Sequence, residues 1–220
     1  MTKYIAEFIG TFGLTFAVLM SLNNSNFAVA TTVIAALTLA LFVYSIGRYS
    51  GTHINPAVTL GLWSVKKIET NDAMMYLVSQ FVGAFFAMVL TTLLIARPEF
   101  ANAVMPSVLG FDGMVLAGEL LGAFIFTFGI ASVVNDTKGG RASAMFAVGG
   151  SLLLGILFAS NMSAGILNPA VALGVKSFDI SYLLGPILGS VLGFNVYHYL
   201  NTMEDDTPAK VEAVVEKEIA

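Results

Sequence analysis

A short motif that the chain carries twice constrains its fold more than any other feature. Asn55-Pro56-Ala57 in the first half returns as Asn168-Pro169-Ala170, 113 positions later. Asn is a favoured N-cap residue, because its side-chain oxygen accepts a hydrogen bond from an unpaired N–H group of the first helical turn. Pro is favoured at the next position, where no N–H is needed. Each copy therefore predicts the start of a helix.

The repeat extends well beyond the two tripeptides. Segment 55–61 matches segment 168–174 at all but one position, and segment 7–12 returns in a similar form as 119–124. Gly83-Ala84 corresponds in the same way to Gly189-Ser190. The pattern predicts one channel-like domain over 1–200, built from two halves at about 1–100 and 112–200, followed by a polar, acidic tail at 201–220.

The composition indicates a membrane protein. Hydrophobic residues make up 57% of the chain and charged residues only 11%, whereas a soluble domain carries about 25% charge. A hydrocarbon core of about 30 Å needs about 20 apolar residues per helix. Six stretches meet that length, at about 4–22, 29–47, 73–96, 113–134, 143–160 and 180–200. The chain is expected to be integral to a lipid bilayer, either a plasma membrane or a bacterial inner membrane.

The basic residues predict the orientation. Basic side chains concentrate on the cytoplasmic side of membrane proteins. With the N-terminus inside, eight of the ten lie on that side, and both termini are cytoplasmic; only Arg97 and Lys176 lie outside. The tail is interpreted as a solvated segment, with a short amphipathic helix as the alternative. The cytoplasmic residues are Lys3, Arg48, Lys66, Lys67, Lys138, Arg141, Lys210 and Lys217.

Three crossings per half make the second half enter from the opposite side, which is an inverted repeat. The segment 55–66 is about 18 Å long as a helix, only about half of the hydrocarbon core. The segments leading into the motifs, about Gly47–Ile54 and Asn161–Leu167, are then irregular backbone at membrane depth, which requires protein or a water-filled cavity around it. The predicted fold is an all-α membrane protein with six transmembrane helices and two re-entrant half-helices.

These features resemble the aquaporin, or major intrinsic protein, family. The resemblance covers about residues 3–200 and rests on both Asn-Pro-Ala motifs, on Ser50–His53 before the first, and on the Ala6–Thr11 opening with its echo at Glu119. It implies a passive channel for water and small uncharged solutes that excludes ions and protons. It also implies a homotetramer with one pore per subunit. We expect no cofactor, no enzymatic activity and no nucleic-acid partner.

The paired motifs are expected to form the pore centre. Two opposed helix N-termini concentrate roughly half an elementary charge each, which repels a cation but not a neutral molecule. With their oxygens used as caps, Asn55 and Asn168 are predicted to turn their amide N–H groups into the lumen. The resemblance implies that this pair orients single-file water and interrupts a proton wire. Structural caps without contact to a lumen are the alternative.

Glu7 and Glu119 are the carboxylates within the apolar stretches. Ionisable groups at membrane depth are costly and usually functional. The resemblance implies that they brace the re-entrant loops by accepting backbone hydrogen bonds; for Glu7 an interfacial position is the alternative. His53 matches a family position that lines the cytoplasmic half of the pore, and a loop-bracing role is the alternative for it.

The chain departs from the family at the selectivity constriction. Most members carry Arg directly after the second Asn-Pro-Ala, where this chain has Val171. Gap-free counting places the other three constriction positions at Ala35, Ile156 and Gly165. A ring of these four residues has neither charge nor strong donors. It predicts a wide constriction that admits glycerol, urea or ammonia.

Two other functions remain open on the sequence alone. An ion-coupled secondary transporter also uses inverted repeats and broken helices, although the apolar stretches hold no carboxylate cluster beyond Glu7 and Glu119. A structural membrane protein with little conduction is the other alternative. Nothing in the chain resembles a nucleophile–base pair or a set of metal ligands, and cysteine is absent.

Overall fold

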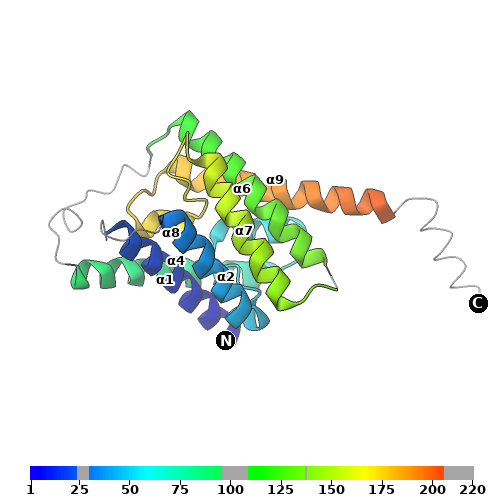
Figure 1. The fold of residues 1–220 in the computed structure, drawn as a ribbon, viewed down its shortest axis with the longest axis horizontal. Helices are drawn as coiled ribbons and strands as arrows, with labels where there is room; N and C mark the ends of the chain where they lie inside the picture. Colours follow the sequence, from blue (N-terminus) through cyan, green and yellow to red (C-terminus); the bar gives the residue numbers. More distant parts are fainter. Residues whose placement is uncertain (24–29, 96–108, 137, 206–220) are drawn as a thin grey trace, which may run out of the picture.

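The computed structural model describes residues 1–23, 30–95, 109–136 and 138–205, and each regular element among them is a helix (Figure 1). Six of these helices are long and apolar enough to cross a membrane, and two are short. This result confirms the predicted fold class. The long helices are α1 (Thr2–Leu22), α2 (Thr31–Ser50), α4 (Thr70–Leu94), α6 (Gly113–Asn135), α7 (Arg141–Ala159) and α9 (Ile180–Asp205). The short helices are α3 (Pro56–Ser64) and α8 (Pro169–Gly174).

Some sequence predictions concern residues that lie outside the described part of the chain. Arg97, which was expected on the outer side, is one of them. The charged tail from residue 206 onward, with Lys210 and Lys217, is another. The choice between a solvated tail and an amphipathic helix therefore stays a prediction.

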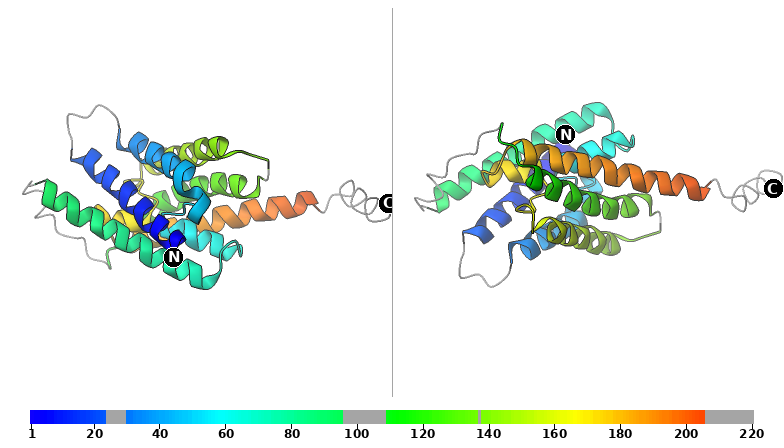
Figure 2. Two further views of the ribbon diagram at one scale, coloured as in Figure 1. Left: turned by 90° about the horizontal axis from the view of Figure 1, so that it is seen from below. Right: turned by 90° about the horizontal axis from the view of Figure 1, so that it is seen from above.

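The two halves of the repeat pack in the same way. In the first half α1 lies along α4, and in the second half α6 lies along α9. Figure 2 shows these two pairs on opposite sides of the bundle. Each short helix packs against a long helix of the other half, α3 against α9 and α8 against α4, and α2 packs against α7. The two halves therefore form one body around the short helices.

Close helix packing depends on glycine at equivalent places in the halves. A Cβ atom added to Gly83 of α4 would lie 2.6 Å from the carbonyl oxygen of Phe8 in α1. One added to its counterpart, Gly189 of α9, would collide with the carbonyl oxygen of Leu120 in α6. Small residues let helix backbones approach closely in membrane proteins. The four-residue spacing of Gly185, Gly189 and Gly193 along α9 is explained in this way.

The first re-entrant loop is shorter than the sequence indicated. Helix α2 continues to Ser50, so the expected irregular segment 47–54 is wrong in its first half. The helix ends at Gly51, which has the left-handed φ of 80° and donates its N–H to the carbonyl of Gly47. Glycine adopts this conformation without steric cost and commonly closes a helix. The glycine at 47, taken as the start of the loop, lies inside the last turn.

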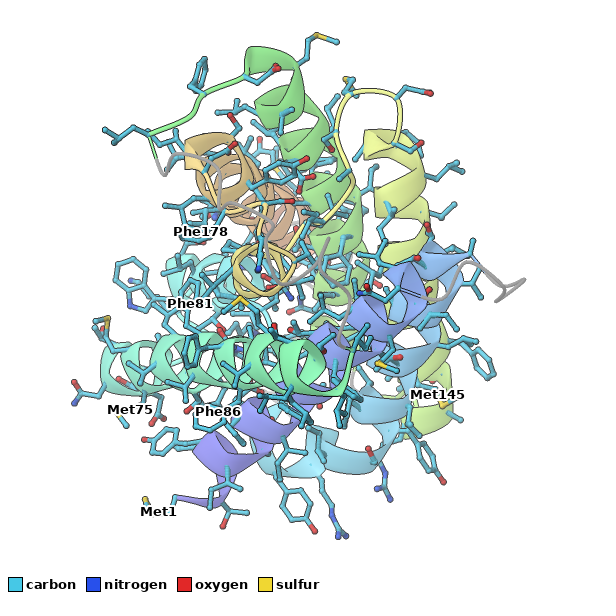
Figure 3. The ribbon with its side chains drawn as sticks, turned by 90° about the vertical axis from the view of Figure 1, so that its left-hand side faces the viewer. Met1, Met75, Phe81, Phe86, Met145 and Phe178 are labelled. Carbon is cyan, nitrogen blue, oxygen red and sulfur yellow. The ribbon has the colours of Figure 1, made fainter. Side chains whose placement is uncertain are left out.

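Large apolar side chains cover the outside of the bundle. Met75 and Phe86 are 45% and 53% exposed, and Figure 3 shows both projecting from α4. Phe81 of the same helix makes an edge-to-face contact with Phe178, with ring centroids 6.1 Å apart. Apolar side chains at the surface suit hydrocarbon rather than water. The exposed face of α4 is thus compatible with contact to lipid.

Candidate functional site

Both motif asparagines cap the short helices that follow them. The side-chain oxygen of Asn55 accepts a hydrogen bond from the N–H of Ala57 at 2.8 Å. The equivalent oxygen of Asn168 accepts from the N–H groups of Ala170 and Val171, at 3.0 and 3.3 Å. Pro56 and Pro169 occupy the first helical position in each case and are buried, as are Ala57 and Ala170. The Asn-Pro pairs thus start the two short helices with the capping geometry that the sequence predicts.

The amide groups of the two asparagines cross from one half to the other. Asn55 Nδ2 donates to the carbonyl oxygen of Leu167 at 2.8 Å, and Asn168 Nδ2 donates to that of Ile54 at 3.0 Å. Ile54 and Leu167 have positive φ angles of 38° and 54°, which are uncommon for non-glycine residues. A side-chain amide has two N–H donors. One N–H of each Asn is therefore used within the protein, and one is left for the lumen. The sequence analysis had expected both N–H groups of each Asn to face the lumen.

The buried carboxylate of Glu7 holds the first loop. Its two oxygens accept from the backbone N–H groups of His53 and Ile54, at 2.9 and 2.6 Å, and from the side-chain amide of Gln80 at 2.7 Å. The residue is fully buried within α1. This geometry differs from the interfacial alternative, because a group at the interface would contact water rather than loop backbone.

Glu119 makes the equivalent contacts in the second half. Its oxygens accept from the backbone N–H groups of Ile166 and Leu167, at 2.9 and 2.6 Å. The hydroxyl of Ser163 donates the third hydrogen bond at 2.8 Å. Backbone N–H groups at membrane depth need such partners, since an unpaired one costs several kcal/mol. Each glutamate thus supplies hydrogen-bond acceptors to the loop that leads to one motif.

A polar network on one side of the short helices includes a residue that the sequence analysis did not identify. Gln80 of α4 is fully buried and donates to the hydroxyl of Thr59 at 2.9 Å, besides its bond to Glu7. The Nδ1 atom of His53 lies 3.1 Å from the same hydroxyl oxygen. A polar amide inside an apolar stretch was the available signal for Gln80. His53 both joins this network and lies on the cavity described next, so the two alternatives for it do not exclude each other.

A cavity of about 240 Å³ lies beside the paired asparagines. It runs from the end where α1 stops and α2 starts, past apolar side chains of α1, α2 and α7, to the centre of the molecule. Asn55, Asn168, His53 and Ile54 form its inner end. Among the described residues of its wall, none is charged. The described chain also holds no group of three or more His, Asp or Glu side chains that could bind a metal ion.

The four positions that the family resemblance assigned to the selectivity constriction all lie on the wall of this cavity. We call Ala35, Ile156, Gly165 and Val171 the filter ring. Ala35 comes from α2, Ile156 from α7, Gly165 from the second loop and Val171 from the first turn of α8. Gly165 has a left-handed φ of 63°. The ring offers methyl groups and a bare backbone rather than a cationic or aromatic surface.

The comparisons with known proteins agree with this architecture. The family model described as "Major intrinsic protein" matches residues 1–197. Among curated proteins, the chain is 30% identical to Aquaporin NIP1-1 of Arabidopsis thaliana, with 90% of this chain and 73% of that protein covered. It is also 30% identical to Aquaporin AqpM of Methanothermobacter thermautotrophicus, with 91% and 97% covered.

A bacterial relative and a solved structure belong to the same group of matches. The glycerol uptake facilitator protein-like 6 of Lactiplantibacillus plantarum is 30% identical, over 87% of this chain and 94% of that one. The crystal structure of the aquaglyceroporin from Plasmodium falciparum has a TM-score of 0.69 at 23% identity and covers 89% of this chain. At that identity the structural match speaks for the fold alone.

Proposed function

The chain belongs to the major intrinsic protein family, and from this premise we propose that its conducting path is the cavity beside Asn55 and Asn168. The protein is an integral membrane protein and a passive channel for water and small solutes, and it is not an enzyme. This result confirms the predicted function over the ion-coupled transporter and the non-conducting structural protein.

The observation that carries the proposal is the pair of crossed hydrogen bonds at the inner end of the cavity. Each asparagine uses its oxygen as a helix cap and one amide hydrogen for the opposite half. The remaining amide hydrogen of each is available to a water or hydroxyl oxygen in the lumen. The N-terminal ends of α3 and α8 repel cations there. In this proposal ion and proton exclusion depends on these groups, since the filter ring carries no cation.

We propose the filter ring as a wide selectivity constriction through which solutes enter the channel. Ala35, Ile156, Gly165 and Val171 leave glycerol, urea and ammonia less excluded than a ring with arginine would. The names of relatives support this reading, since one is named glycerol uptake facilitator protein-like 6 and two are named aquaporins. The domain limits at 1–200 and 201–220 belong to the same proposal.

The assembly and the orientation are further parts of the proposal. Both termini are cytoplasmic, because eight of ten basic residues then lie inside. The cavity then opens to the extracellular side. The functional unit is a homotetramer in a plasma or bacterial inner membrane, with one pore per subunit, as the family resemblance implies.

Stopped-flow light scattering of proteoliposomes tests the proposed path. Water, glycerol and urea permeability are compared for the wild type, Asn55→Ala and Asn168→Ala, with protein-free vesicles as the baseline. Flux that is linear in the gradient, has a low activation energy and changes in both variants is expected. Wild-type flux above baseline that neither substitution alters would place the path elsewhere.

A further inference from the structure

The inverted repeat predicts a second ring on the other side of the asparagine pair. Aligning Asn55 with Asn168 without gaps assigns each residue of the filter ring an equivalent in the opposite half. We call these four equivalents the valine ring. The pairs are Ala35 with Val148, Ile156 with Val43, Gly165 with Thr52, and Val171 with Val58.

Contacts between the halves support this alignment. Leu39 and Leu152 are equivalent in it, and both lie on the wall of the cavity. Ala36 and Gly149 are also equivalent, and a Cβ atom on Gly149 would lie 2.9 Å from the carbonyl oxygen of Ala36. Helices α2 and α7 therefore cross where equivalent residues face each other. The two rings then lie on opposite sides of that crossing.

The valine ring is bulkier than the filter ring. Alanine and glycine in the filter ring correspond to valine and threonine in the valine ring, while the other two positions stay aliphatic. Val58 and Val148 are buried, as are Val171 and Ala35, so the difference between the rings lies in side-chain size. The hydroxyl of Thr52 donates to the carbonyl of Phe42 at 3.2 Å, so its donor is already used. The ring thus offers a passing solute little space and no free side-chain donor.

The cavity does not reach the valine ring. Its wall ends at His53, Ile54 and the asparagines, and none of the four valine-ring residues, all of which the structure describes, lies on it. Val58 and Val148 belong to the main apolar cluster, as do Ala35 and Val171 of the filter ring. The valine ring differs from the filter ring in that its residues do not line the cavity. The open space beside the asparagine pair therefore does not continue to the valine ring.

We infer that the valine ring, not the filter ring, is the narrowest part of the path and sets the solute size limit and the rate. The inference rests on the proposed function, because it assumes a path past the asparagine pair. A narrow apolar constriction hinders water by dewetting and hinders larger solutes by contact. The wide filter ring then determines what enters, and the valine ring determines how fast it passes.

Permeability of proteoliposomes tests the inference. In Val148→Ala, the valine ring carries alanine at the position equivalent to Ala35 of the filter ring, so the ring becomes wider. We expect water and glycerol flux to rise by about three- to tenfold, with a lower activation energy. Val171→Ala widens the filter ring and should change flux by a smaller factor. Val78→Ala, on the exposed face of α4, is the neutral control, and circular dichroism checks that each variant is folded.

Single cysteines give a second measurement, because the chain contains no cysteine. A charged, membrane-impermeant methanethiosulfonate reagent is added from the extracellular side of the proposed orientation. Val171→Cys should react and lose flux, whereas Val58→Cys should stay unmodified until the protein is unfolded in detergent. Reaction of Val58→Cys at the rate of Val171→Cys would overturn the inference.

The outcomes separate the inference from the proposed function. Equal increases in flux for Val148→Ala and Val171→Ala, or a larger increase for Val171→Ala, would overturn the inference. The proposed path past the asparagines would still stand. Wild-type and Val148→Ala vesicles that are both as slow as protein-free ones would overturn both. A slow wild type that becomes conducting in Val148→Ala supports both.

Discussion

The side-chain amide of Asn55 donates to the carbonyl oxygen of Leu167, 2.8 Å away, and so ties the start of one half-helix to the loop that feeds the other. Asn168 and Ile54 make the equivalent bond. The two loops arrive from opposite sides, so these bonds join the halves at the centre of the molecule. The group that caps each helix therefore also holds the geometry of the proposed lumen.

Replacement of Asn55 by aspartate separates these two roles. Asn55→Asp keeps an oxygen that accepts from the N–H of Ala57, but it loses the N–H that donates to the carbonyl oxygen of Leu167. A lost buried hydrogen bond that leaves its acceptor unpaired costs about 1–3 kcal/mol in the free energy of unfolding. The added negative charge should also raise cation leakage, which dye-loaded proteoliposomes measure.

The matched control is Asn71→Asp, at an exposed position in the first turn of α4. We expect it to change the free energy of unfolding by less than about 0.5 kcal/mol. Unfolding is followed by detergent titration. An Asn55→Asp protein as stable and as cation-tight as this control would contradict the assigned roles of the amide.

The glutamates should be sensitive to loss of one oxygen. Glu7→Gln and Glu119→Gln turn an acceptor into an NH₂ group that faces backbone N–H donors, which leaves a loop N–H unpaired. We expect each to lower the free energy of unfolding by about 1–3 kcal/mol and to reduce water flux. Glu69→Gln is the control, since Glu69 is exposed and its side chain makes no capping bond. Full activity and stability in both buried variants would refute the bracing role.

Local signals in the sequence were sufficient for much of the site. The Asn-Pro pairs identify the two half-helix starts because capping involves only neighbouring residues. Glu7 and Glu119 stand out because an ionisable group is rare inside an apolar stretch. Ala35 and Ile156, which lie on the cavity wall, were instead selected through the family resemblance by gap-free counting.

Other features could not be predicted because they depend on distant partners. The bond from Asn55 to Leu167 joins residues 112 positions apart, and no local pattern indicates it. Gln80 was missed because its side chain is uncharged, and its role depends on the packing of α4 against α1, which brings its amide to Glu7. The end of α2 was missed for a local reason: the helix continues to Ser50 and is closed by the left-handed Gly51, whereas the loop was expected to begin at Gly47.

The filter ring gives a prediction for solute selectivity. Val171→Arg places a long cationic side chain at the cavity wall, which should lower glycerol permeation in proteoliposomes and spare water more than glycerol. Val171→Met adds similar length without charge and separates bulk from electrostatics. Stopped-flow light scattering gives both rates. If Val171→Arg leaves the glycerol rate unchanged, Val171 does not line a constriction that glycerol passes.

The glycines at the helix crossings give the last prediction. Gly83→Ala would place a Cβ atom 2.6 Å from the carbonyl oxygen of Phe8, closer than van der Waals contact allows. Because the obstacle is backbone, α1 and α4 must separate, and we expect a loss of about 1–3 kcal/mol in unfolding free energy. Gly150→Ala in α7 meets no atom within 4 Å and should instead stabilise its helix, by about 0.5–1 kcal/mol. Detergent unfolding of both variants checks whether the free energy of unfolding falls for Gly83→Ala and rises for Gly150→Ala. Equal effects would mean that α1 and α4 are not held at the distance that Gly83 permits.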